Sequence, residues 1–188
     1  MPDDPPPELA ELTLAQIAEQ VEQRKLPPVE GWAPQSRGDS LMQITADGRW
    51  FHDGGEITRA AMVRAFSGLL SRDEDGQHWL VTPFEQLSIA VEDAPFIAVD
   101  CVRKNGDIVF RLNTDDLIVA GPNHPIRAAG DADAPALYLH VRRGCEARLN
   151  RSTYEQLAQI ALSEAKPGAD EDWTVTSGGQ TFSLLPAA

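Results

Sequence analysis

Basic residues are scarce in this chain. Its 188 residues include 16 Lys and Arg against 29 Asp and Glu, which gives a formal net charge of −13 at pH 7. Nucleic-acid binding draws most of its non-specific affinity from cationic side chains that neutralise phosphates, and anionic membrane surfaces attract the same side chains. The composition therefore argues against nucleic acid and membrane surfaces as partners.

Long apolar runs are also missing from the sequence. No stretch approaches the roughly 20 apolar residues that a membrane-spanning helix needs. The chain begins Met1-Pro2-Asp3-Asp4, whereas a secretory signal peptide begins with basic residues followed by an apolar segment. We therefore expect no membrane association and a cytoplasmic location.

Cysteine and histidine are too few and too scattered for a recognisable metal or redox motif. Cys101 and Cys145 lack CxxC spacing, which favours two reduced thiols. The four histidines are His52, His78, His124 and His140. They show neither HxxxH nor HExxH spacing, and neither a GxSxG motif nor a phosphate-binding glycine loop occurs. We expect no metal and no cofactor.

A helix is predicted near the N-terminus. Leu14, Ile17 and Val21 recur at helical spacing, and Thr13 and Gln16 have the spacing of a capping box. A Pro-Pro pair then ends the helix, because proline lacks the amide donor that the next turn requires. The apolar stripe must pack either on the rest of the chain or on a partner protein.

After residue 38 the pattern changes to short extended runs separated by turns. Asp47-Gly48 and Asn105-Gly106 lie between such runs and are typical of β-hairpins. The strands come in hairpins instead of alternating one for one with helices, which predicts an α+β fold. We divide the chain into an N-terminal helix with a proline-rich linker, a first α+β unit and a second α+β unit, at residues 1–38, 39–95 and 96–188.

An internal repeat is predicted from two similar stretches. Each has a glycine turn between strands, an Arg at the start of a helix, and Trp-x-Val-Thr after that helix. The paired positions are Gly48 with Gly144, Arg59 with Arg151, and Trp79 with Trp173. The pattern predicts two copies of a strand-strand-helix-strand-strand motif, at residues 40–90 and 136–185, with additional antiparallel strands between them.

Four residues are candidates for a ligand site. His124 and Arg127 lie in a turn stiffened by prolines, which can bind an anion or simply form a rigid connection. Arg59 and Arg151 each begin a helix, where the helix dipole disfavours a cation, so we expect a carboxylate or several backbone carbonyls to hold each of them unless it binds a ligand. Glu85 and Asp93 are the acids expected for Arg59, and Asp93 is the fourth candidate for the ligand site.

The combined motifs resemble a known bacterial family. They are Asp47-Gly48-x-Trp50, Ile57-x-Arg59, Leu80-Val81-Thr82-Pro83-x-Glu85, Val91-Glu92-Asp93-Ala94-Pro95-Phe96, His124-Pro125-Ile126-Arg127 and Ser177-Gly178-Gly179. They are similar to those of the bacterial domain-of-unknown-function family 1285, over about residues 31–185. The resemblance implies a two-domain α+β protein with repeated structural motifs and a suggested part in signal transduction, and it implies no enzyme activity.

Three functional hypotheses follow. We expect a non-enzymatic binding or regulatory protein that recognises a small molecule or a partner protein. The enzyme alternative uses His124 as acid or base and Arg127 or Arg59 as an anion clamp, and it needs them to converge with Asp93 in one pocket. The third hypothesis is a scaffold that captures a partner through the apolar stripe of its N-terminal helix.

Overall fold

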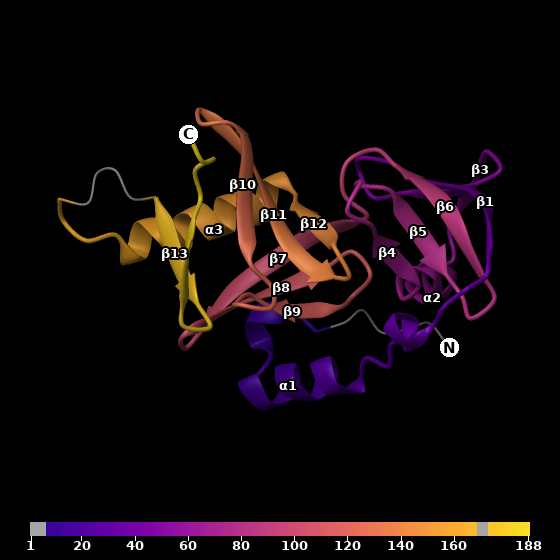
Figure 1. Ribbon diagram of the computed structural model, residues 1–188. Helices are drawn as coiled ribbons and strands as arrows, with labels where there is room; N and C mark the ends of the chain where they lie inside the picture. The colour runs from indigo at the N-terminus through magenta and orange to yellow at the C-terminus, as the bar shows by residue number, and fades with distance from the viewer. Residues whose placement is uncertain (1–6, 169–172) are drawn as a thin grey trace.

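The computed structural model describes residues 7–168 and 173–188 of the chain. Figure 1 shows two lobes side by side, each built around a six-stranded sheet. The first lobe, which we call the first unit, contains β1 (Ser36–Ile44), β2 (Trp50–His52), β3 (Gly55–Ile57), α2 (Ala60–Ser67), β4 (Leu70–Arg72), β5 (His78–Val81) and β6 (Glu85–Val91). Among the described residues, no helix has the length and apolar character required to cross a membrane.

The sheet of the first unit has the order β3-β2-β1-β6-β5-β4. Its two central strands, β1 and β6, are parallel, and the other neighbouring strands pair antiparallel. The predicted hairpin at Asp47-Gly48 is confirmed, with Gly48 at φ +85° in the turn between β1 and β2. Helix α2 packs Val63 and Phe66 against the core, where Phe66 stacks on the buried Trp50.

The second unit contains β7 (Phe96–Lys104), β8 (Asp107–Leu112), β9 (Leu117–Val119), β10 (Ile126–Asp131), β11 (Ala134–Arg142), β12 (Cys145–Leu149) and α3 (Arg151–Glu164). Its sheet has the order β10-β11-β12-β7-β8-β9, and again the two central strands, β7 and β12, are parallel. The Asn105-Gly106 hairpin between β7 and β8 is confirmed. A separate hairpin of β13 (Thr174–Ser177) and β14 (Gln180–Ser183) follows α3.

The two sheets share one topology, so the α+β fold with two similar units is confirmed. In each sheet the first and last strands are central and parallel, and the second to fifth strands extend outward as hairpins. The units differ in where the helix falls: α2 lies between the third and fourth strands, whereas α3 follows the sixth strand.

The residue alignment that we used to predict the repeat is wrong. Gly48 joins the first two strands of its sheet, but Gly144 joins the last two strands of the other sheet. Trp79 lies in β5, whereas Trp173 precedes the separate β13–β14 hairpin. The strands expected between the copies, from residue 96 onward, belong to the second sheet. A hairpin followed by a helix is a local pattern, and only long-range strand pairing decides its place in a sheet.

The N-terminal segment packs on the second unit. It comprises a 3-10 turn η1 (Leu9–Glu11), helix α1 (Leu14–Gln23) and a second 3-10 turn η2 (Val29–Gly31). Both hydrogen bonds of the predicted capping box are present at Thr13. Ile17 is buried with Val109 and Leu117, whereas Leu14 and Val21 are exposed. The apolar stripe therefore docks within this chain through Ile17.

A turn of the second unit docks on the first unit. The carbonyl of Arg143, between β11 and β12, accepts a hydrogen bond from the backbone N–H of Arg72 at 2.9 Å. The Arg143 side chain donates to the carbonyls of Leu70 and Gly68, at 2.8 and 2.5 Å. Backbone and side-chain hydrogen bonds thus join β4 directly to the turn before β12.

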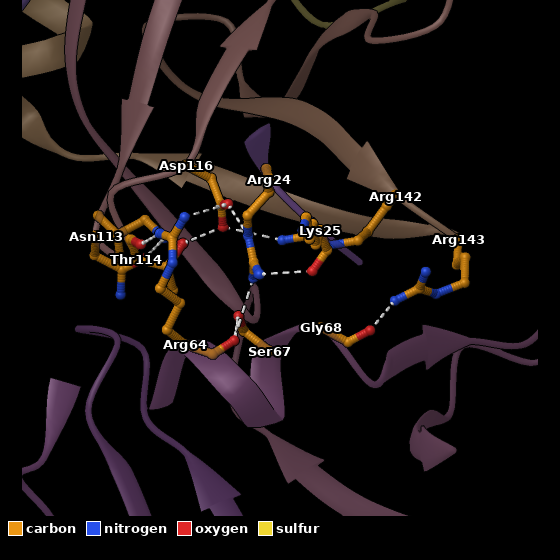
Figure 2. Close-up of polar contacts among 11 residues, drawn as sticks. Arg24, Lys25, Arg64, Ser67, Gly68, Asn113, Thr114, Asp116, Arg142 and Arg143 are labelled. Atoms are coloured by element: carbon orange, nitrogen blue, oxygen red, sulfur yellow. Dashed lines mark hydrogen bonds and ion pairs between the residues drawn. The ribbon is translucent and has the colours of Figure 1, made fainter. Parts of the chain in front are cut away.

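Buried charges connect all three parts of the chain (Figure 2). Asp116, just before β9, pairs with Arg24 after α1 at 2.5 Å and with Arg142 on β11 at 3.0 Å. Arg64 of α2 lies 3.7 Å from the same carboxylate, and the Thr114 hydroxyl donates to it at 2.6 Å. We call these five residues the Asp116 network. It ties the N-terminal segment and both units to one carboxylate.

Candidate ligand site at the junction of the two units

The connection between β6 and β7 places one carboxylate against the second sheet. Asp93 accepts a hydrogen bond from the Tyr138 hydroxyl at 2.7 Å and another from Nη1 of Arg148 at 2.9 Å. The same Nη1 donates to the Tyr138 oxygen at 3.2 Å. Burial and the hydrogen bond to Asp93 raise the pKa of the Tyr138 phenol, so the phenol keeps its proton and acts as donor. The inter-unit connection is thereby held on the face of the second sheet.

Three neighbouring strands present a row of side chains on that face. Tyr138 of β11 lies opposite Arg127 of β10 and opposite Arg148 of β12 in the strand register. Both guanidinium carbons lie over the Tyr138 ring, at 4.5 Å for Arg127 and 5.4 Å for Arg148. Cation–π contacts of this kind orient both arginines on the sheet.

The two arginines differ in how their donors are used. Arg127 donates through Nε and Nη2 to the two carboxylate oxygens of Glu146, at 3.0 and 2.7 Å. Arg148 makes its hydrogen bonds through Nη1 alone. Within the part of the chain that the structure describes, its Nε and Nη2 contact no acceptor. The edge of Arg127 that suits a carboxylate is therefore occupied, and the same edge of Arg148 is open.

Two pockets meet at Arg148. The first, of about 440 Å³, lies between the β10–β11 hairpin and the start of α3. The second, of about 490 Å³, lies between the two units. Both are lined by Arg148, Leu149 and Arg151, and we call them together the Arg148 groove. The remaining lining residues are Asp133, Ala134, Pro135, Leu137, Tyr154 and Glu155 in the first pocket, and Ala46, Asp47, Asp93, Ile97, Val99, Asn113 and Asn150 in the second.

A smaller, more polar pocket lies on the other side of Asp93. It has a volume of about 190 Å³ and is lined by Arg72 and His78 of the first unit and by Arg127, Tyr138 and Glu146 of the second. Burial and the nearby Arg72 lower the pKa of His78, so this imidazole is mostly neutral at pH 7. The pocket is small for an organic ligand, because such sites usually start near 300 Å³.

The structure brings together only two of the four candidate residues. Asp93 and Arg127 line the same 190 Å³ pocket. His124 is directed to β11, where its Nδ1 donates to the carbonyl of His140 at 3.0 Å, and the linings of the three pockets above do not include it. Arg59 is exposed at the N-cap of α2.

The prediction that Arg59 pairs with Glu85 or Asp93 is wrong. Asp93 pairs with Arg148, and Glu85 forms no salt bridge among the described residues. Arg151 does pair with a carboxylate, that of Glu155 at 3.0 Å, but its side chain is 93% exposed. Both arginines lie at helix starts in water, where solvent screening reduces the dipole penalty that we expected a partner to offset.

Sequence reasoning missed the central pair of the site, Tyr138 and Arg148. A signal was available, because both belong to a predicted hairpin around Arg143-Gly144 in which polar and apolar residues alternate. If the two strands are paired residue by residue from that turn, however, Tyr138 and Arg148 do not lie opposite each other. One extra residue on β11 between His140 and Arg142 shifts the register and brings Tyr138 opposite Arg148.

Potential metal ligands do not gather in the described part of the chain: it contains no group of three or more His, Cys, Asp or Glu arranged to hold an ion. Cys101 and Cys145 are free and buried, and burial raises the pKa of each thiol to about 12. Neither cysteine is therefore suited to act as a nucleophile at neutral pH.

Fold and site together define a two-unit α+β protein with repeated six-stranded sheets and a polar junction. The family model "Domain of unknown function (DUF1285), N-terminal domain" matches residues 27–94, and "Protein of unknown function (DUF1285), C-terminal domain" matches residues 95–184. The chain belongs to the DUF1285 family, which confirms the resemblance seen in its motifs.

Two solved bacterial structures are similar to this chain. A DUF1285 family protein from Silicibacter pomeroyi DSS-3 is 37% identical, with a TM-score of 0.76 over 93% of this chain and 96% of that one. A DUF1285 family protein from Shewanella baltica OS155 is 26% identical, with a TM-score of 0.53 over 64% of this chain and 91% of that one. No curated protein matches.

Proposed function

We propose that this protein is a non-enzymatic regulatory protein that binds a small molecule in the Arg148 groove. One observation carries the proposal: Arg148 is bonded to the inter-unit connection through Asp93 and also lines two adjoining pockets, one of which has walls from both units. The volumes of these pockets lie within the usual range for small-molecule sites. Apolar walls with a few polar groups are also typical of such sites.

A ligand bound in the groove would contact both units. A ligand that touches Ala46 or Asp47 contacts the first unit, and the same ligand at Arg148 contacts the second. Because binding stabilises the arrangement that it favours, it would strengthen this relative placement of the units. Such coupling is what a ligand-responsive step of cytoplasmic signal transduction requires.

Binding is favoured over catalysis by the same geometry. His124, the acid or base of the enzyme hypothesis, donates to a backbone carbonyl, and Arg127 is held by Glu146. General acid–base catalysis needs a titratable group within hydrogen-bond reach of the substrate. In the groove Asp47, Asp93 and Glu155 each pair with an arginine, and the linings of the two pockets include no histidine.

The test is a fragment screen by saturation-transfer NMR on the full chain and on groove-blocking variants. Ala134→Trp and Ala46→Trp each place an indole at an exposed alanine that lines one of the two pockets. Ala61→Trp on exposed α2, which lines neither pocket, is the matched control. We expect hits that bind the wild type and the control and are lost in a blocked variant. Hits that bind all four proteins equally would refute the proposal.

A further inference from the structure

We infer that the ligand is an amphipathic oxyanion whose carboxylate or phosphate head pairs with the Nε/Nη2 edge of Arg148. This inference rests on the proposed function, because it assumes that the groove is a ligand site. It adds the chemical class of the ligand and the group that recognises it.

The open edge of Arg148 is the first observation. Arg127 and Arg148 flank the same tyrosine, and Arg127 shows what such an edge does when an acid is in reach: it takes both oxygens of Glu146. Arg148 is 39% exposed, is oriented by Tyr138 and Asp93 through Nη1, and lines both pockets of the groove. A guanidinium held by one nitrogen keeps a two-donor edge whose geometry matches an oxyanion.

Three of the four acids that line the groove already have an arginine partner. Acids outnumber bases by 29 to 16 in the chain, yet none of these four acids pairs with the Nε/Nη2 edge of Arg148. Asp47 pairs with Arg49, Glu155 pairs with Arg151, and Asp93 bonds to the other end of the Arg148 guanidinium. Asp133, which lines the first pocket together with Arg148, accepts no hydrogen bond from a described residue. An acceptor from outside the chain would complete the donor set of Arg148.

The apolar walls of the first pocket favour a ligand with an apolar body. Pro135, Leu137, Leu149 and Tyr154 line the first pocket beside Arg148. Leu137 and Leu149 are already buried, so a simple inorganic anion would leave the half-buried Pro135 and Tyr154 in contact with water, whereas an apolar body would cover them and gain the free energy of burying apolar surface. The groove therefore fits an anionic head joined to an apolar body better than a free inorganic ion.

The experiment compares three naphthalene probes by isothermal titration calorimetry on the full chain. They are 2-naphthoate, 2-naphthyl phosphate and the neutral isostere 2-naphthamide. We expect at least one anion to bind about tenfold or more tightly than the amide, which corresponds to one charge-assisted hydrogen-bonded pair. Comparing the carboxylate with the phosphate identifies the preferred head group.

Variants assign the preference to one arginine. Arg148→Lys keeps the charge beside Asp93 but removes the two-donor edge, and we expect it to weaken the anion about tenfold while leaving the amide unchanged. Arg127→Lys, whose edge is occupied by Glu146, is the matched control and should change either affinity by less than about twofold. In the wild type, the Nε–H NMR signal of Arg148 should shift on addition of the anion and that of Arg127 should not, which tests the assignment without a variant.

The outcomes separate the inference from the proposed function. Equal affinity of amide and anion, lost together in Ala134→Trp, would keep the groove as the site and overturn the oxyanion. An anion preference that survives Arg148→Lys, or no shift of the Arg148 signal, would also overturn it. If no anion binds, the inference fails by itself, and the fragment screen alone decides whether the groove binds ligands.

Discussion

At the scale of single residues, the most interconnected side chain is Asp116. Its carboxylate is 2% exposed and lies against Arg24, Arg64 and Arg142, which come from three different parts of the chain. Arg24 and Arg142, whose side chains are 17% and 10% exposed, depend on this acid, because an unpaired buried charge is strongly unfavourable. The Nε of Arg142 is buried without a partner among the described residues, which makes Asp116 still more important to that side chain.

We expect Asp116→Asn to destabilise the protein by about 3–5 kcal/mol, because it keeps the shape of the side chain but leaves buried arginines without a counter-charge. Urea denaturation measures the loss. Glu155→Gln is the control, since the Glu155–Arg151 pair is largely exposed and should change stability by less than about 1 kcal/mol. Equal effects of the two substitutions would mean that the Asp116 network does not stabilise the fold.

Gly144 is one of the residues at which the two units pack closely. It has φ +76°, and a Cβ there would lie 2.9 Å from the carbonyl oxygen of Arg72 in the first unit. Gly130 has a similar φ of +83° but open space where a Cβ would be. Both alanine substitutions carry the backbone penalty of a left-handed residue, and only Gly144→Ala adds a clash.

We therefore expect Gly144→Ala to lower the free energy of unfolding by about 1–3 kcal/mol more than Gly130→Ala, in line with typical overpacking penalties. Urea denaturation of both variants gives the difference. Identical losses would show that the contact between Gly144 and β4 contributes nothing to stability in solution.

At the scale of elements, α1 is held by one buried position of its apolar stripe. Ile17 is 2% exposed, whereas Leu14 is 43% exposed. Ile17→Ala removes apolar contacts under the helix and should lower the stability of the folded chain by about 2–5 kcal/mol. Leu14→Ala removes few contacts and should have little effect. Opening of α1 should expose the chain at Arg24 and Lys25, where trypsin cleaves.

We expect Ile17→Ala to speed tryptic cleavage at Arg24–Lys25 at least tenfold over wild type, because local opening of the helix becomes more frequent. Leu14→Ala should stay within about twofold. Mass spectrometry of early digests identifies the cut. If both variants are cleaved alike, α1 is not anchored through Ile17.

At the scale of the whole molecule, stability should decrease between pH 7 and pH 5. Burial, more than any other cause, lowers the pKa of His124 in the folded chain below its ordinary value of about 6.5. Between the two pKa values the unfolded chain binds more protons than the folded one. The stabilisation is therefore complete above about pH 6.5 and is lost as the pH falls through the folded pKa.

We expect His124→Gln, which cannot titrate but can still donate to the His140 carbonyl, to lose less stability than wild type over this range. His78, whose pKa is also lowered by burial, accounts for part of the loss that remains. His52→Gln changes an exposed histidine and should follow the wild type. Parallel pH profiles for His124→Gln and wild type would rule out the contribution of His124.

The candidate site was only partly predictable from the sequence. Asp93 and Arg127 were recognised because each belongs to a predicted turn that contains a proline, and such a charged turn can be identified from the sequence. Arg148 was not, because its importance depends on which residue lies across from it and on which of its nitrogens are occupied. His124, although close to Arg127 in sequence, is directed to a carbonyl of the next strand.

Local chemistry determined what the sequence by itself could show: the capping box at Thr13, the hairpins at Asp47-Gly48 and Asn105-Gly106, the α+β class and the family. These features depend on neighbouring residues or on motifs. Only the tertiary structure decided the place of each hairpin in its sheet and the pairing of Tyr138 with Arg148. The physical reason is that parallel pairing joins strands from opposite ends of each unit, and one extra residue on β11 changes which side chains face each other.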